Sequence, residues 1–443
     1  MPDLVHEFLN NFAHNLFKPL LLFFYMGFLI PILKVPFEFP KVLYQSLTLY
    51  LLIAIGWHGG EELASLSTKE FGQAGGFMVI GFFTNLLIGI VAYFLLRAGT
   101  RLRKIDAATV AGFYGSDSAG TFVTCVGVLG AGVVAIPYAA YMPVMLAIME
   151  IPGCLVALYL VSRLRAQGMD VHGNMEGEEG YISAEADAGS VLDVEERRYA
   201  NSASSTGSSK AYRAQGGGSS TAVAEPTTMG KYVEAARSGE RSGQGAGFGS
   251  HGGHEGKPAN SHSIFSLKMM HEVFLNPGLF LLFGGIVIGF VGRSQGVKVT
   301  ADDDKLFVSL FHPILCLFLL EMGITACRRL RDLRTAGWRF IAFAILGPNV
   351  FAAIGICIAH LYSMALGEPF DIGTYALFAV LCGAASYIAV PAVQRLAIPE
   401  ASPTLPLAAS LGLTFTYNVT IGIPVYILMA QSVTAAFPVE MVS

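Results

Sequence analysis

A polar run in the middle of an apolar segment decides the fold: Gly112-Phe113-Tyr114-Gly115-Ser116-Asp117-Ser118-Ala119-Gly120-Thr121. The surrounding residues, Ile105–Leu129, are apolar enough to cross a membrane. An ionised Asp at the centre of a spanning helix costs roughly 2.5–3.5 kcal/mol on insertion scales. Main chain released by a helix break must face protein or a water-filled cavity. We therefore predict that this helix is broken and that a ligand binds at the break.

A second interruption lies far downstream, in the run Leu381–Pro391. Sliding the chain by 267 positions pairs the two interruptions, and it also pairs Gly56 with Gly323. Interrupted spans at matching positions of two halves indicate a transporter's binding site. We expect the two breaks to meet at the membrane midplane.

Composition indicates a polytopic membrane protein. The chain has 443 residues, of which 53% are hydrophobic and 14% charged, and a mean hydropathy of +0.56. Soluble domains carry about 25% charged residues. We count ten apolar runs as membrane spans, which predicts an all-α fold. They are Pro19–Leu33, Val42–Gly56, Gly76–Leu96, Ile105–Leu129 and Tyr138–Val161 in the first half, and Val273–Val291, Leu306–Cys327, Phe340–Tyr362, Ile372–Leu396 and Leu407–Leu428 in the second.

The chain divides into two five-span repeats, 1–165 and 264–443, joined by the linker 166–263. The linker is rich in Gly and Ser and cannot bury enough apolar surface to offset its ordering entropy, so we expect it to be disordered. Basic residues follow the third, fifth, seventh and ninth spans, which places the linker in the cytoplasm. Because five spans per half is an odd number, the repeats would be inverted.

The predicted breaks suit an ion pair. Ser118, Thr121 and Ser386 are residue types that cap helix amino ends, and Pro391 suits a first turn. Two amino ends converging on one spot would bind a small oxyanion. The carboxyl ends near Tyr114 and Cys382 present free carbonyl groups that, with Asp117, suit Na⁺.

Several intramembrane polar residues allow two interpretations. Asp117 would be ionised at the site, or protonated, or paired with an Arg. Glu150 and Glu321 would each be a gate or relay, or lie near a span end and reach water. Asn418 and its threonine neighbours suit interhelical hydrogen bonds and ion coordination equally well.

The second half carries motifs of a known family. The runs Gly383–Val393, Ile398–Ala401 and Leu413–Pro424, with Gly56–Gly60, Leu320–Gly323 and Tyr114–Ser118, resemble the sodium-dependent bicarbonate transporter family. The likeness covers nearly all of the chain outside the linker.

The resemblance implies ten helices in a five-plus-five inverted repeat, with bicarbonate at the crossing of two broken helices and Na⁺ as the coupling ion. It also implies a multi-pass protein of the bacterial cell (inner) membrane, a homotrimer and a PII-like cytosolic regulator near the linker. Ser118, Thr121 and Ser386 fall on the family's hydroxyl positions. The chain departs from the family at Tyr387, where cyanobacterial members carry Asp, and at Asp117, where they carry a non-acidic residue.

These observations predict a sodium-coupled importer of bicarbonate in the lipid bilayer, without a catalytic residue, a cofactor other than Na⁺, or a nucleic-acid partner. The alternatives are a sodium-coupled transporter of another small carboxylate and a membrane sensor or scaffold that transports nothing. The residues predicted to bind the anion are Ser118, Gly120, Thr121, Ser386, Tyr387 and Ala389. Those predicted to bind Na⁺ are Ser116, Asp117, Thr414, Thr416 and Asn418.

Overall fold

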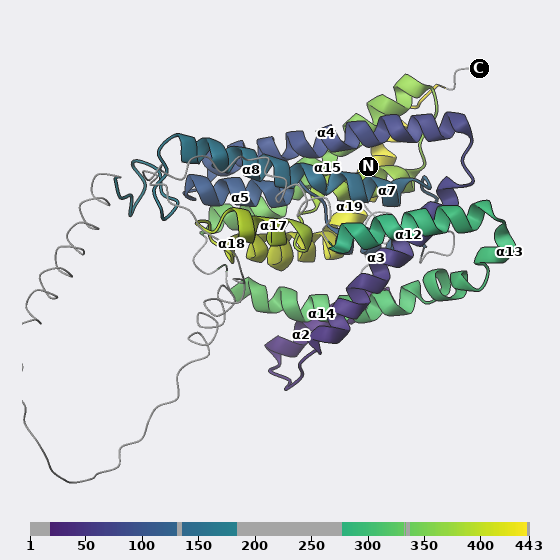
Figure 1. The fold of residues 1–443 in the computed structure, drawn as a ribbon, viewed down its shortest axis with the longest axis horizontal. Helices are drawn as coiled ribbons and strands as arrows, with labels where there is room; N and C mark the ends of the chain where they lie inside the picture. The colour runs from purple at the N-terminus through teal and green to yellow at the C-terminus, as the bar shows by residue number, and fades with distance from the viewer. Residues whose placement is uncertain (1–17, 131–134, 184–276, 332, 334–336, 441–443) are drawn as a thin grey trace, which may run out of the picture. The chain divides into compact units, whose positions relative to one another are not determined.

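A computed structural model describes residues 18–130, 135–183, 277–331, 333 and 337–440. Within these ranges the chain is helical and contains no strand, in agreement with the predicted all-α class (Figure 1). The first half comprises α2 (Pro19–Ile32), α3 (Lys41–Leu63), α4 (Thr68–Gly99), α5 (Lys104–Tyr114), α6 (Ala119–Gly130), α7 (Met142–Met149) and α8 (Ile151–Ala166).

The second half begins with α12 (Pro277–Ser294), α13 (Val297–Thr300), the π-helical η1 (Lys305–Ser309) and α14 (Phe311–Leu330). It continues with α15 (Trp338–Leu366), α16 (Ile372–Gly383), α17 (Ala389–Ala397) and α18 (Leu405–Leu407), and ends with η3 (Ala408–Phe415), η4 (Asn418–Gly422) and α19 (Ile423–Ala436).

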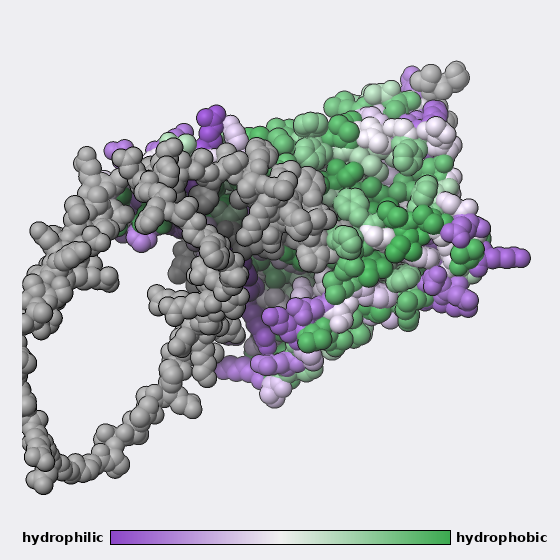
Figure 2. All heavy atoms as spheres, in the orientation of Figure 1, coloured by the Kyte–Doolittle hydropathy of each residue, from purple (hydrophilic) through white to green (hydrophobic). Residues whose placement is uncertain are grey.

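Five helical stretches of the described residues are long and apolar enough to cross a membrane. They are Thr68–Gly99, Met142–Ala166, Phe311–Leu330, Trp338–Leu366 and Leu405–Ala436. Large hydrophobic side chains such as Phe83, Phe94 and Leu346 are exposed along them. Figure 2 shows hydrophobic residues gathered over the middle of the helices and hydrophilic residues near helix ends. This distribution fits a membrane protein, whose outer surface faces lipid.

Two helix pairs pack at backbone distance: α3 against α12, and α2 against α14 (Figure 1). Glycine makes both contacts possible. A Cβ atom on Gly56 of α3 would overlap the Leu282 carbonyl oxygen of α12, and one on Gly323 of α14 would overlap the Phe24 carbonyl oxygen of α2. Small residues permit this approach between membrane helices. The pair Gly56 and Gly323, which the 267-residue offset aligns, thus occupies equivalent contacts.

The remaining helices surround the two interrupted segments. In the first half α4 and α8 pack against α5, and in the second half α15 and α19 pack against α16. Aromatic side chains fill the space between the halves: the Phe77 ring lies 4.6 Å from that of Phe378 and 5.4 Å from that of Tyr362, between ring centroids. The core therefore joins helices far apart in the sequence.

The first part of the predicted linker, residues 167–183, forms hydrogen-bonded turns. The Asp170 carboxylate accepts main-chain N–H groups of His172, Asn174 and Ile182 at 2.7–3.0 Å. Glu178 accepts the N–H of Lys104 at 2.8 Å, which attaches the loop to the start of α5. The prediction of disorder concerned residues 166–263, of which 184–263 lie outside the described residues.

Candidate functional site: two broken helices that cross

The first predicted break is present. Helix α5 ends at Tyr114, where the Gly115 N–H donates back to the Ala111 carbonyl at 2.8 Å, and α6 begins at Ala119. Ser118 occupies the position before α6, and its Oγ accepts the Thr121 N–H at 3.3 Å and lies 3.0 Å from Thr121 Oγ1. Ser118 therefore caps α6, as its residue type predicted, and Thr121 lies in the first turn.

The second break separates α16, which ends at Gly383, from α17, which begins at Ala389. Pro391 is the third residue of α17 and lies in its first turn, as predicted. The prediction that Ser386 caps this helix was wrong, because Ile388 holds the N-cap position and no side chain caps it. Ser386 instead lies in the non-helical segment between α16 and α17.

The two breaks touch each other. The Ser386 N–H donates a 2.9 Å hydrogen bond to the Phe113 carbonyl oxygen, in the last turn of α5. Helix α5 contacts α17, and α6 contacts α16. Since the first half of each segment meets the second half of the other, the segments cross in opposite directions. Main-chain groups freed by one break thus satisfy groups freed by the other.

The residues predicted to bind the anion lie around this crossing. The side chains of Ser118, Thr121 and Ser386 are at most 3% exposed. Gly120 lies directly beneath the Tyr387 hydroxyl, because a Cβ atom at position 120 would overlap that oxygen. Ala389 is the first residue of α17.

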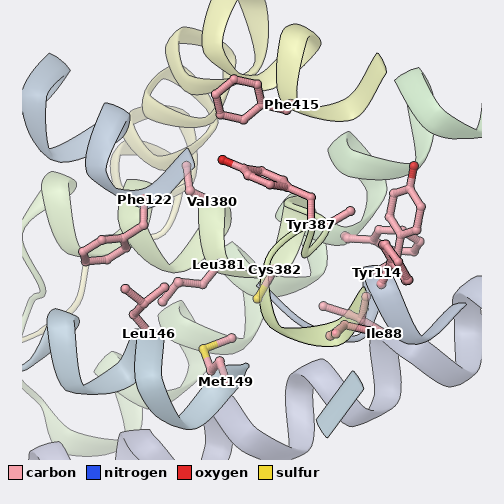
Figure 3. Packing of buried hydrophobic residues seen from close by; sticks show 14 of the residues in the cluster. Ile88, Tyr114, Phe122, Leu146, Met149, Val380, Leu381, Cys382, Tyr387 and Phe415 are labelled. Carbon is pink, nitrogen blue, oxygen red and sulfur yellow. The ribbon is translucent and has the colours of Figure 1, made fainter. Parts of the chain in front are cut away.

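The Tyr387 side chain is held by an aromatic contact. Its ring packs at 5.4 Å between centroids and 75° against Phe415 of η3. Figure 3 shows the Tyr387 hydroxyl directed away from Tyr114 and toward Val380. This buried hydroxyl faces the Ser118 hydroxyl but meets no acceptor among the described residues at hydrogen-bond distance and angle. A buried hydroxyl without a partner is costly, which makes Tyr387 a candidate donor for a ligand at the crossing.

The residues predicted to bind Na⁺ divide into two groups. Thr414 and Asn418 join helix ends: the Tyr114 and Thr414 hydroxyls lie 2.6 Å apart, and Thr414 Oγ1 donates to the Ala344 carbonyl at 2.7 Å. Asn418 Nδ2 donates to the Gly383 carbonyl at 3.0 Å, at the end of α16. Thr416 keeps a buried Oγ1 without a partner among the described residues.

Asp117 and Ser116 form the other group, on the first break itself. Ser116 Oγ donates to the Glu150 main-chain carbonyl at 2.8 Å. Asp117 is completely buried, and neither of its carboxylate oxygens has a hydrogen-bond partner among the described residues. The ion pairs found in the described part of the chain include no Arg–Asp117 contact. The interpretation that an Arg neutralises Asp117 therefore has no support.

Two polar residues near the break were not among the predicted site residues. Glu150 lies at the junction of α7 and α8 and is 9% exposed, so it does not reach water freely from a span end. Asn85 of α4 is fully buried, and its Nδ2 donates to the Met149 carbonyl at 2.9 Å. A lone amide within an apolar run was the available sequence signal for Asn85.

A cavity of about 190 Å³ opens between α5 and α17 beside the crossing. Phe113 and Pro391 line it next to the second break, and Gln394 and Arg395 line it further along α17. Gln394 Nε2 donates to the Thr109 carbonyl at 3.1 Å, which links the two cavity walls. The cavity therefore provides space for a small polar solute next to the breaks.

Comparison with known proteins agrees with this arrangement. A search of curated proteins finds no match to the chain. Residues 19–431, nearly the whole chain, match the family model for the Na⁺-dependent bicarbonate transporter superfamily. This range includes both broken helices and every predicted site residue. The chain thus belongs to the Na⁺-dependent bicarbonate transporter superfamily.

Proposed function

We propose that the protein is a secondary transporter that imports bicarbonate together with Na⁺. The observation that carries the proposal is the contact of the two breaks through Ser386 and Phe113. It brings the amino end of α6, capped by Ser118, beside the chain that precedes α17. Helix amino ends carry about half a positive charge and free N–H groups, which suit a small oxyanion without an arginine.

The anion is bound, in this proposal, by hydroxyls and N–H groups of the crossing. Ser118, Thr121 and Ser386 supply hydroxyls, Tyr387 supplies its unpaired phenol, and the main chain near Gly120 and Ala389 supplies N–H groups. Where cyanobacterial members of the family carry Asp, this chain has Tyr387. The Tyr387 phenol is a neutral donor, so this residue adds no negative charge to the anion site. Bicarbonate, with three oxygens and one negative charge, fits such a set of donors.

Sodium is bound on the same break. The unpartnered carboxylate of Asp117 supports this assignment most directly, because a buried charge without a partner is costly and a cation removes that cost. Ser116, Thr414, Thr416 and Asn418 are the other residues assigned to Na⁺. Moving one cation with one anion carries no net charge, whereas bicarbonate alone would enter a negative-inside cell against about 2.3 kcal/mol per 100 mV.

The proposed architecture is a ten-span inverted repeat with repeats 1–165 and 264–443. Equivalent packing supports it: α2 against α14 corresponds to α12 against α3, and the α4–α5 contact corresponds to the α15–α16 contact. Basic residues, among them Arg165 and Arg395, mark one membrane face as cytoplasmic. In this orientation the 190 Å³ cavity opens toward the cytoplasm, and the linker lies there as well.

The family resemblance extends the proposal to a homotrimer in the bacterial cell membrane and to a PII-like regulator that binds near the linker. Sizing of the purified protein by multi-angle light scattering tests the trimer. A pull-down with protein lacking residues 184–263 as control tests the regulator.

Uptake of radiolabelled bicarbonate into proteoliposomes tests the function. We expect uptake that requires Na⁺ and fails when choline replaces it. Asp117→Asn should raise the Na⁺ concentration for half-maximal uptake, whereas Glu321→Gln, which removes another intramembrane acid, should leave that Na⁺ concentration unchanged. Uptake that is indifferent to Na⁺ contradicts the coupling.

Competition separates the remaining alternatives. If unlabelled acetate inhibits bicarbonate uptake as well as unlabelled bicarbonate does, the substrate is a wider class of small carboxylates. No flux of either anion, with folded protein in the vesicles, favours a sensor or scaffold over a transporter.

A further inference from the structure

The first break has a second polar face, around Asp117. Ser118 is directed toward Thr121, through the hydrogen bond that caps α6. Asp117 has different neighbours: its carboxyl group interacts electrostatically with Glu150 and with Cys382 at the end of α16. The break therefore presents Ser118 to the crossing and the adjacent Asp117 to a buried polar region near the end of α16 and the α7–α8 junction.

Asn85 of α4 has an orphan acceptor in the same buried region. Its Nδ2 donates to the Met149 carbonyl at 2.9 Å and to the Leu381 carbonyl at 3.5 Å. These carbonyls immediately precede Glu150 and Cys382, the two neighbours of Asp117. Asn85 Oδ1 is buried and accepts no hydrogen bond within the described residues. Because hydrogen bonds from Nδ2 hold the amide group in place, Asn85 Oδ1 is available to a ligand.

Close packing brings the neighbouring helices to the break. A Cβ atom on Gly153 of α8 would lie 2.7 Å from Ser116 Cβ, and one on Gly89 of α4 would lie 3.1 Å from Gly115 Cα. Because these positions are glycine, α8 and α4 reach the break on the side of Glu150 and Asn85. The contact of α8 with Ser116 therefore places Glu150 beside the break, and the contact of α4 with Gly115 places Asn85 there.

The chemistry of this buried polar region is that of a cation site. Asp117 Oδ1, Asp117 Oδ2 and Asn85 Oδ1 are three buried acceptors without donors, and the Glu150 carboxyl adds a second acidic group. Donor-free oxygen clusters of carboxylate and amide suit hard cations. By contrast, Thr414 and Asn418 already have hydrogen-bond partners at the ends of α5 and α16.

We propose that Asn85 and Glu150 complete, with Asp117, the binding site for the coupling Na⁺. The inference rests on the proposed sodium coupling, and it assigns that ion to the buried polar region where α4, the end of α16 and the α7–α8 junction approach the first break. Asp117 and Glu150 supply carboxylate oxygens and Asn85 supplies its amide oxygen. The anion then binds on the neighbouring face, at Ser118, so the two ions lie on adjacent residues of one break.

Equilibrium binding of ²²Na⁺ to the purified full-length protein, without bicarbonate, tests the site. Glu150→Gln removes the charge at nearly constant size, and Asn85→Ser removes the amide oxygen. Each should weaken Na⁺ binding by at least about tenfold, the order seen when the surroundings of a bound metal are altered. Glu321→Gln is the matched control, because it removes an intramembrane carboxylate from α14, outside this polar region, and should leave Na⁺ affinity unchanged.

The outcomes separate this inference from the proposed function. Wild-type affinity in both Glu150→Gln and Asn85→Ser overturns the site, even if bicarbonate uptake by the wild type requires Na⁺. Uptake without any need for Na⁺ overturns the coupling itself. If Glu150→Gln does not yield folded protein, judged by gel filtration, Asn85→Ser decides alone: weakened binding supports the site and unchanged binding overturns it.

Discussion

The hydroxyl of Tyr387 lies over Gly120, on the opposite broken helix, so closely that no side chain fits between them. The next atoms that a Cβ at position 120 would meet are Tyr387 Cζ at 3.2 Å and Phe318 Cε1 at 3.3 Å. The two interrupted segments are thus in contact through the Tyr387 side chain as well as through the Ser386 N–H. This contact gives a direct test of the crossing.

Gly120→Ala should destabilise the protein by about 1–3 kcal/mol, the usual cost of overpacking a tight contact. Because the phenol oxygen is the main obstacle, adding Tyr387→Phe should recover much of that loss. Thermal unfolding in detergent, without ligands, measures both variants and their combination. Gly130→Ala is the control on the same helix, since a Cβ there meets nothing within 4 Å. Purely additive effects of Gly120→Ala and Tyr387→Phe would refute the contact.

Two adjacent glycines of α12 test the helix pair α3–α12. A Cβ on Gly285 would lie 2.7 Å from the Ile53 carbonyl oxygen, whereas one on Gly284 meets nothing within 4 Å. We expect Gly285→Ala to cost about 1–3 kcal/mol, and Gly284→Ala to be neutral or stabilising by up to about 1 kcal/mol, since Ala favours helix over Gly. Unfolding in detergent measures the difference. Equal stabilities of the two variants would show that the helices are not this close.

Asn418 should stabilise the fold by joining α16 to α19. Its Nδ2 donates to the Gly383 carbonyl at 3.0 Å, and its Oδ1 accepts the Tyr426 hydroxyl at 2.6 Å. Asn418→Ala leaves both partners buried and unpaired, so we expect a loss of roughly 2–4 kcal/mol. Tyr426→Phe leaves only one unpaired atom and should cost about 1–2 kcal/mol. Unfolding is measured without Na⁺, so that ion binding does not contribute. A larger loss in Tyr426→Phe than in Asn418→Ala contradicts this account.

The loop after α8 should depend on pH. Partial burial tends to raise the pKa of Asp170, but hydrogen bonds from Asn174, Ile182 and His172 outweigh this and lower it. The native carboxylate therefore stabilises the loop fully above the ordinary Asp pKa, and this stabilisation is lost as pH falls through the lowered native pKa. Hydrogen exchange, corrected for intrinsic rates, should show protected amides at these three residues near neutral pH. Asp170→Asn should remove much of that protection at neutral pH, and protection that survives the substitution would show that the carboxylate does not order the loop.

The breaks could be predicted from sequence because their signal is local. Asp117 within an apolar run is costly in an unbroken helix, and Gly, Ser and Pro near both interruptions are residues of helix ends. Ser118 indeed caps α6. The breaks and the cap at Ser118 depend on residues that are adjacent in the chain, so a single sequence is enough to predict them.

What the sequence did not predict depends on distant partners. Ser386 has the residue type of a helix cap, but its N–H bonds to Phe113, 273 positions earlier in the chain, and α17 begins further on. Asn85 and Glu150 become significant only because α4 and the α7–α8 junction pack against the first break. The turn at Asp170 falls in the predicted flexible linker because the segment as a whole is rich in Gly and Ser. Composition does not reveal that a single carboxylate, Asp170, orders its own loop by accepting main-chain hydrogen bonds.

The half-helices are too short to stand alone in a bilayer. Helix α5 has 11 residues and α6 has 12, so they extend about 16 Å and 18 Å against a hydrocarbon layer of about 30 Å. A single half-helix that slid past its neighbours would leave its open end facing lipid. In the proposed transporter, a displacement that carries both ions across the membrane would therefore move the half-helices together with α4, α8, α15 and α19, which pack against them.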